Sequence, residues 1–155
     1  MAASATGTGP VQVNRGTFGG NGIVTGPVTI GTGTTPAVLS PGGIHGVGLL
    51  TLQSSLTFKA NTLYRWNIEA ATLRTDQVVA QGVTIESAAE LRVNPHGTIL
   101  PVGEVFVVIS NSSASPISGT FTNLPDGGTI TIGSNTFQAN YEGGDGNDLT
   151  LTVVP

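Results

Sequence analysis

The chain has 155 residues, of which only 9% are charged, whereas about a quarter of the residues of an ordinary soluble domain are. The formal net charge is −4 and the five basic residues are widely spaced, which argues against a nucleic-acid-binding protein. Hydrophobic residues make up 38% of the chain, enough to exclude a disordered linker. The 23 glycines and 9 prolines disfavour long helices and favour an all-β fold of strands and turns.

The N-terminal end carries no targeting signal that we recognise. Residues 1–10 are small and polar, and we expect them to form a loose lead-in. Residues 1–5 lack the charged and apolar regions of a signal peptide, so we expect either that a signal has been removed or that the chain is a segment of a longer protein. No apolar run approaches the roughly 20 residues that a membrane helix needs, so we expect no membrane insertion.

The amino-acid composition favours a location outside the cell. Threonine, serine, asparagine and glutamine must supply the solubility that charges do not, and the chain has no cysteine. We interpret this composition as that of a bacterial extracellular or cell-surface protein whose fold is independent of disulfide bonds.

From residue 11 onward the sequence consists of short apolar segments, many of them alternating with threonine, that are separated by glycine or proline. A period of two residues is typical of half-buried strands. The main segments are 11–13, 23–25, 28–30, 37–39, 49–52, 56–58, 64–68, 78–79, 83–85, 91–93 and 105–109. Residues 68–76 and 86–90 could be mistaken for helices, but both are too short, and we expect loops or single turns there.

Such short and closely spaced strands are typical of a parallel β-solenoid, whereas a β-sandwich would have fewer and longer strands. We therefore predict one domain over 1–155 that forms a parallel β-helix. At about 20–25 residues per coil, a value taken from known repeats, the chain would make about six coils. Loops 70–75 and 111–116 are expected to protrude.

Residues 116–155 differ from the rest of the chain. Three alternating strands are separated by tight turns at 125–128, 133–135 and 143–146, which predicts an antiparallel C-terminal cap. Nothing comparable stands at the N-terminal end, so one end of the solenoid is expected to be open. An open end exposes backbone groups that can pair with another chain.

Several short sequence motifs resemble those of a known family. They are Val-Leu-Ser-Pro-Gly-Gly at 38–43, Gly-Leu-Leu-Thr-Leu at 48–52, Thr-Asp-Gln-Val-Val at 75–79 and Tyr-Glu-Gly-Gly-Asp-Gly-Asn-Asp at 141–148. In these motifs the chain resembles the autotransporter-associated β-strand repeat proteins of bacterial surfaces, although in the motif at 75–79 Thr75 replaces the usual aromatic residue. The resemblance implies a right-handed parallel β-helix that is exported, structural or adhesive, and without enzyme activity.

The glycine-rich turn near the C-terminus is a candidate metal site. Residues 143–149 resemble one calcium-binding nonapeptide, in which Asp145, Asn147 and Asp148 would be the oxygen ligands. Thr150 stands where that motif has a large apolar residue, and no tandem copy follows. The alternative is a glycine turn whose side chains bond to their own backbone. We expect no cofactor other than this possible calcium ion.

Two aromatic residues are candidate sugar contacts. Tyr64 and Trp66 fall on the same face of a predicted strand, from which aromatic rings could stack on a glycan. The alternative is that both rings belong to the core.

Charged residues around the same region could serve an enzyme. Arg74, Asp76, Glu86, Glu90 and Arg92 include the acidic and basic groups that a polysaccharide-degrading β-helix enzyme needs, but surface charge explains them equally well. His45 and His96 lie beside glycines without a second ligand nearby, so a metal site there is not expected.

The sequence thus favours a structural, non-enzymatic β-solenoid that associates end to end. Its partner would be a second copy in a head-to-tail filament, or the preceding coils of a longer parent protein. The alternatives are a glycan-binding module and a polysaccharide-degrading enzyme.

Overall fold

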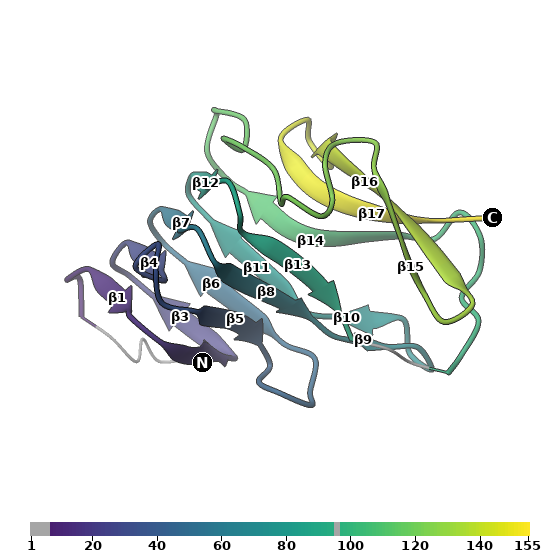
Figure 1. Cartoon of the computed structure of the whole chain (residues 1–155), viewed down its shortest axis with the longest axis horizontal. Coiled ribbons are helices and arrows are strands. Elements are labelled where there is room, and N and C mark those ends of the chain that lie inside the picture. Colours follow the sequence, from purple (N-terminus) through teal and green to yellow (C-terminus); the bar gives the residue numbers. More distant parts are fainter. Residues whose placement is uncertain (1–6, 95–96) are drawn as a thin grey trace.

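The structure is a computed structural model that describes residues 7–94 and 97–155 (Figure 1). Across these residues it is all-β, without a helix, which confirms the predicted fold class. In the described residues there is accordingly no helix long and apolar enough to cross a membrane. The segment 68–76 forms a two-stranded hairpin of β9 (Ile68–Glu69) and β10 (Arg74–Thr75), and residues 86–89 form a turn.

Twelve parallel strands build the solenoid in four rungs of three strands each. The rungs are β1 (Val11–Val13), β2 (Gly16–Gly20) and β3 (Gly22–Val24); β4 (Val28–Ile30), β5 (Ala37–Pro41) and β6 (Leu49–Leu52); β7 (Leu56–Phe58), β8 (Thr62–Trp66) and β11 (Gln77–Ala80); and β12 (Val83–Ile85), β13 (Glu90–Val93) and β14 (Val105–Asn111). The chain from β1 to β12 completes about three turns.

Equivalent strands of successive rungs lie side by side and form three sheets. Sheet B is β1-β4-β7-β12 and sheet C is β2-β5-β8-β13. Sheet A runs β3-β6-β11-β14 and continues into the last three strands of the chain. Stacked parallel strands confirm the predicted β-solenoid, but the predicted count of six coils is not confirmed. The second and third turns are longer than expected because loops 31–36 and 42–48 and the segment 67–76 interrupt the strands, and the antiparallel C-terminal strands add no further coil.

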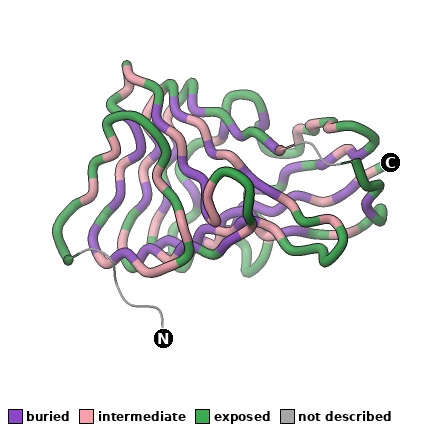
Figure 2. Tube along the Cα trace, turned by 90° about the horizontal axis from the view of Figure 1, so that it is seen from below, coloured by how far each residue is buried: buried purple, intermediate pink, exposed green. Residues whose placement is uncertain are grey.

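Stacking in register places similar side chains above one another. In sheet B the register aligns Val11, Val28, Leu56 and Val83 in one inward column. Buried residues alternate with intermediate or exposed ones along the strands, as Figure 2 shows. Each fully buried aliphatic or aromatic side chain contributes about 1.5–3 kcal/mol, and these contributions offset the conformational entropy that a glycine-rich chain loses.

Aromatic side chains fill the core between the third rung and the C-terminal strands. Phe58 stacks on Tyr64 with ring centroids 5.8 Å apart, and Phe121 packs edge-on against Phe58 at 5.3 Å. Trp66 makes two edge-on contacts, to Phe106 and Phe137, both at 5.8 Å. Since Phe121 and Phe137 belong to the C-terminal segment, this cluster joins the cap to the solenoid.

The chain ends in an antiparallel extension of sheet A. Strand β17 (Asp148–Val154) pairs with β14, β16 (Asn135–Gly143) pairs with β17, and β15 (Thr129–Ile132) pairs with β16, all antiparallel. The antiparallel pairing predicted for 116–155 is therefore confirmed. Of the predicted lead-in 1–10, residues 1–6 lie outside the described residues, and 7–10 precede β1 without forming a strand.

Candidate functional site

The two ends of the solenoid differ in how their backbone edges are satisfied. At the C-terminal end, the segment after β14 crosses the edges of β12 and β13. In sheet B, Ile85 N–H donates to Ser118 O at 2.7 Å and Ser118 N–H donates to Val83 O at 2.9 Å. The residue after Ser118 must be glycine, because a Cβ on Gly119, whose φ is +83°, would lie 2.1 Å from Ile85 O. The edge of sheet B is thus closed by backbone.

Sheet C is closed at the same end by a side chain. Asn123 Oδ1 accepts from Leu91 N–H at 3.0 Å, and Asn123 Nδ2 donates to Leu91 O at 2.7 Å. One amide side chain therefore pairs with both backbone groups of a β13 residue, as a neighbouring strand would. Tyr141 fixes this segment from the cap, since its Oη donates to Leu124 O and accepts from Phe121 N–H.

Replacing Asn123 by alanine is expected to lower the free energy of unfolding by about 1–3 kcal/mol, because the donor and the acceptor of Leu91 lose their partner at once. Urea denaturation followed by circular dichroism measures the change. The control is Asn14→Ala, at an exposed loop position, which should cost less than about 0.5 kcal/mol. Equal effects of the two substitutions would contradict a capping role for Asn123.

At the N-terminal end, the strands of the first rung are the outermost members of their sheets. Among the described residues no strand pairs with the outer edges of β1, β2 or β3, which we call the N-terminal edge. The core is also incomplete there, since Val11, Val13 and Phe18 are only partly buried. Their counterparts in the next rung are Val28, Ile30 and Leu39, which are at most 1% exposed.

The N-terminal edge lacks the features that usually keep an exposed strand from pairing. Natural sheets protect such edges with charged residues, prolines or bulges. Strands β1, β2 and β3 contain no charged residue and no proline. Arg15, in the loop between β1 and β2, is exposed and is the first charged residue of the sequence. This edge is the best candidate for a docking site in the described part of the chain.

Sequence reasoning missed a buried polar network centred on Asp76. The Asp76 side chain is fully buried. Its Oδ1 accepts from Gly48 N–H at 2.8 Å, and its Oδ2 accepts from Asn67 N–H at 3.0 Å and from Asn67 Nδ2 at 2.7 Å. Burial raises the pKa of the Asp76 carboxyl to about 6, although the N–H donors from Asn67 and Gly48 act in the opposite direction. The carboxylate joins the loop before β6 to the loop before β11 and is structural.

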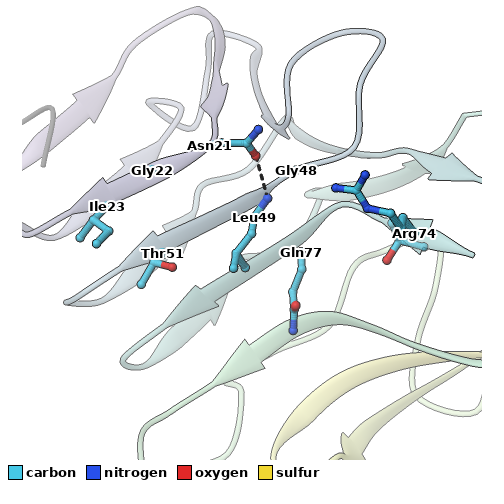
Figure 3. Close-up of a pocket in the computed structure, with 9 residues that line it drawn as sticks. Asn21, Gly22, Ile23, Gly48, Leu49, Thr51, Arg74 and Gln77 are labelled. Atoms are coloured by element: carbon cyan, nitrogen blue, oxygen red, sulfur yellow. Dashed lines mark hydrogen bonds between the residues drawn. The ribbon is translucent and has the colours of Figure 1, made fainter. Parts of the chain in front are cut away.

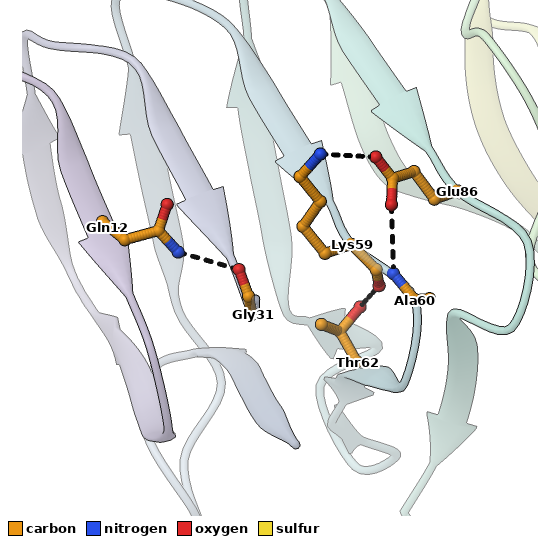
Figure 4. A network of polar contacts seen from close by, with 6 residues as sticks. All are labelled: Gln12, Gly31, Lys59, Ala60, Thr62 and Glu86. Atoms are coloured by element: carbon orange, nitrogen blue, oxygen red, sulfur yellow. Dashed lines mark hydrogen bonds and ion pairs between the residues drawn. The ribbon is translucent and has the colours of Figure 1, made fainter. Parts of the chain in front are cut away.

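Side chains also join the rungs at the turn between sheets B and C (Figure 4). Lys59 Nζ contacts Glu86 Oε1 at 2.6 Å, and Glu86 Oε2 accepts from Ala60 N–H at 3.3 Å. The hydrogen bond from Lys59 lowers the pKa of the Glu86 carboxyl. In the first rung Gln12 Nε2 donates to Gly31 O at 2.8 Å. These contacts hold the first rung to the second and the third rung to the fourth.

A shallow groove of about 650 Å³ lies on the outer face of sheet A (Figure 3). Asn21, Leu49 and Gln77 follow one another across three rungs in register. Leu49 is 48% exposed, and Arg74 extends from β10 at one side of the groove, with Glu69 4.0 Å away. The groove therefore combines an apolar side chain, two amides and one cation.

The prediction that Tyr64 and Trp66 contact a glycan is wrong. Both side chains are fully buried, because the inward face of β8 packs against the aromatic residues of the cap. Tyr64 Oη donates to Val108 O at 3.0 Å, and Trp66 Nε1 donates to Asp76 O at 2.8 Å. The alternative that both rings belong to the core is correct.

The glycine-rich turn anchors a neighbouring loop. Asp148 Oδ1 accepts from Asn111 N–H at 2.8 Å, and Asn147 Nδ2 donates to Ser113 O at 2.5 Å. Burial raises the pKa of the Asp148 carboxyl. Asp145 is exposed, and Asn147 Oδ1 is buried without a hydrogen-bond partner among the described residues. No group of three or more His, Cys, Asp or Glu residues able to hold a metal occurs in the described residues. Calcium binding at Asp145, Asn147 and Asp148 stays a prediction, and an unchanged melting temperature in EDTA would count against it.

Of the residues considered for an enzyme, Glu90 and Arg92 are exposed on the same face of β13 and line one shallow pocket, whereas the other three lie elsewhere. Asp76 is buried in its network, Arg74 lies at the edge of the groove, and Glu86 is engaged with Lys59. His45 is exposed in the loop before β6, and His96 lies outside the described residues.

No family model, curated protein or solved structure was found to match this chain in sequence or in fold.

Proposed function

We propose that this chain is a structural, non-enzymatic component of a bacterial surface or secreted protein, and that its N-terminal edge is the site at which it assembles end to end. The observation that carries the proposal is the difference between the two ends of the solenoid. All three strands of the last rung have partners on their outer edges, whereas within the described residues the three strands of the first rung have none.

An open edge offers unpaired N–H and C=O groups together with partly exposed core side chains. Both are satisfied when another β-structure adds to the edge, which is β-augmentation. The occupant is a second copy in a head-to-tail filament, or preceding coils where the chain is part of a longer protein. A head-to-tail contact between copies leaves one end free at each step and gives an open filament.

The resemblance to autotransporter-associated repeats adds two features to this proposal. They are a right-handed winding of the solenoid and export of the chain to the cell exterior. Adhesion or matrix formation at the cell surface is the role that fits a sparsely charged solenoid of this kind. A count of six coils would require further turns beyond the described rungs.

The purified chain is expected to form filaments in negative-stain electron microscopy and to sediment as a concentration-dependent series of oligomers. The variant Val11→Lys should stay monomeric, because it places a charge on the inward face of the open edge, where further stacking would bury it. The control Thr57→Lys adds the same charge to the middle of sheet B and should still assemble. A wild-type chain that remains strictly monomeric at high concentration would contradict the proposal.

A glycan-binding module is the second candidate, and the groove on sheet A is the observation that favours it. The exposed Asn21, whose Oδ1 accepts from Leu49 N–H, and the half-buried Gln77 flank Leu49, and Arg74 could pair with an acidic sugar. Binding to a glycan array that is lost in Arg74→Ala would support this function. An array without signal for the wild-type chain would count against it.

A further inference from the structure

The sequence distributes its charge unevenly along the solenoid axis. Up to residue 58 the only charged residue is Arg15, whereas from Glu104 onward all five charged residues are acidic. The segment between them carries four basic and four acidic residues and is neutral overall. Because the rungs stack in chain order, the open end is weakly positive and the C-terminal end is negative (Figure 1).

Exposed charged residues lie towards both ends of the solenoid, where a second copy would approach. Arg15 is exposed in the loop between β1 and β2, at the N-terminal edge. Asp126, Glu142 and Asp145 are exposed in the turns and strands of the C-terminal segment. Opposite potentials on two surfaces steer them together, and like potentials hold them apart.

Sheet A has an open edge at each of its two ends. Its order places β3 at one edge and β15 at the other, and among the described residues neither outer edge is paired. The two strands are similar in length, with three and four residues, and neither contains a charged residue or a proline. In β15 the exposed Thr129 and Thr131 alternate with the half-buried Ile130 and Ile132, a pattern with high β-propensity.

From these two observations we infer that the occupant of the N-terminal edge is the C-terminal end of a second copy, whose β15 adds to β3 so that sheet A continues from one subunit to the next. The acidic end of one copy then approaches the end of the next copy that carries Arg15. This inference rests on the proposed end-to-end assembly and specifies its orientation. The opposite orientation, with two N-terminal edges together, would bring two arginines together and would close as a dimer.

Disulfide trapping tests the inference directly, because the chain has no cysteine of its own. One single-cysteine variant carries Ile23→Cys in β3, and the other carries Thr131→Cys in β15. Oxidation of a mixture of the two should give a cross-linked heterodimer, whereas neither variant alone should give a cross-linked dimer of comparable yield. A mixture of Ile23→Cys with Thr34→Cys, in an exposed loop of the second rung, is the control and should remain uncross-linked.

Sedimentation of the same samples separates the two possible failures. Oligomers without the β3–β15 cross-link would overturn this inference and leave the proposed function standing. Cross-linking of Ile23→Cys to itself would overturn the inference in favour of a closed dimer. Absence of any oligomer would overturn the proposed function, and the inference would fall with it.

Charge reversal provides a second readout. Arg15→Glu should slow assembly at low salt. Added salt should slow assembly of the wild-type chain and speed that of the variant, because it screens the attraction in the first case and the repulsion in the second, over about 8 Å at physiological ionic strength. Identical rates for the two proteins at low salt would overturn the charge-steered orientation.

Discussion

Replacing Trp66 by alanine is expected to lower the free energy of unfolding by about 3–5 kcal/mol. The indole is fully buried and packs edge-on against Phe106 and Phe137, and its Nε1 donates to Asp76 O. Truncation would therefore open a cavity between the solenoid and its cap and leave a buried carbonyl without its donor. A small domain has only about 5–15 kcal/mol of stability, so the variant should be close to unfolded at 37 °C.

Urea denaturation followed by far-ultraviolet circular dichroism measures this loss without depending on tryptophan fluorescence. Tyr64→Phe is the matched control, since it keeps a ring in the cluster and removes only the hydrogen bond to Val108 O, for an expected cost of about 0.5–1.5 kcal/mol. A loss below about 1 kcal/mol for Trp66→Ala would contradict the position of the indole in the core.

Replacing Asp76 by asparagine is expected to destabilise the fold by about 1–3 kcal/mol for each donor left unsatisfied. The carboxylate accepts three hydrogen bonds from N–H groups, one at Oδ1 and two at Oδ2. An asparagine side chain has only one acceptor oxygen, so its NH₂ group must face at least one of these donors. Thermal unfolding at pH 7 measures the loss, and Asn14→Ala, at an exposed position between β1 and β2, provides a control near zero.

The pH dependence of this difference has a definite sign. The folded-state pKa of Asp76 is raised to about 6 from its ordinary value near 3.8, so the folded protein binds the proton more tightly than the unfolded chain. The carboxyl therefore adds stability as the pH falls from about 7 towards 4, and this contribution is lost as the pH rises through 6. Glu86 and Asp148 titrate in both proteins, so subtracting the two curves isolates Asp76.

The advantage of the wild-type chain over Asp76→Asn should accordingly widen at acidic pH. Denaturation curves of the two proteins at pH 4.5, 6 and 8 test this expectation. A gap that stays constant or narrows on acidification would contradict the raised pKa of the Asp76 carboxyl.

Short periodic segments were sufficient to predict the solenoid. The segments 11–13, 28–30, 56–58 and 83–85 each place two inward apolar residues around one outward residue, and in the structure they stack directly in sheet B. Their spacing could not give the number of turns, because loop 42–48 lengthens the second turn and the segment 67–76 the third without leaving a periodic signal.

The sites were less predictable than the fold because a strand pattern shows which residues share a face but not what covers that face. Tyr64 and Trp66 were correctly placed on one side of a strand, yet their burial depends on Phe121 and Phe137, which lie far away in sequence. Asp76 was noticed only as a charge near Arg74. Asp76 follows a polar loop and directly precedes an apolar strand. This position was the only indication in the sequence that its carboxyl group faces inward.

The C-terminal cap was also only partly predictable from the sequence. The glycine turns and alternating strands of 116–155 predicted antiparallel strands, and the pairing of β14 through β17 confirms this arrangement. The role of Asn123 depends on its approach to Leu91, 32 residues earlier, and no local pattern carries that information.

Amide hydrogen exchange at two protein concentrations tests most directly whether one end of the solenoid is open and the other closed. In dilute solution the amides of β1, β2 and β3 that face away from the second rung should exchange rapidly, and the outward amides of Ile85 in β12 and Leu91 in β13 should be protected. At high concentration, the first-rung amides should become protected as another copy covers their edge. First-rung amides that are already as protected in dilute solution as those of the last rung would contradict the account.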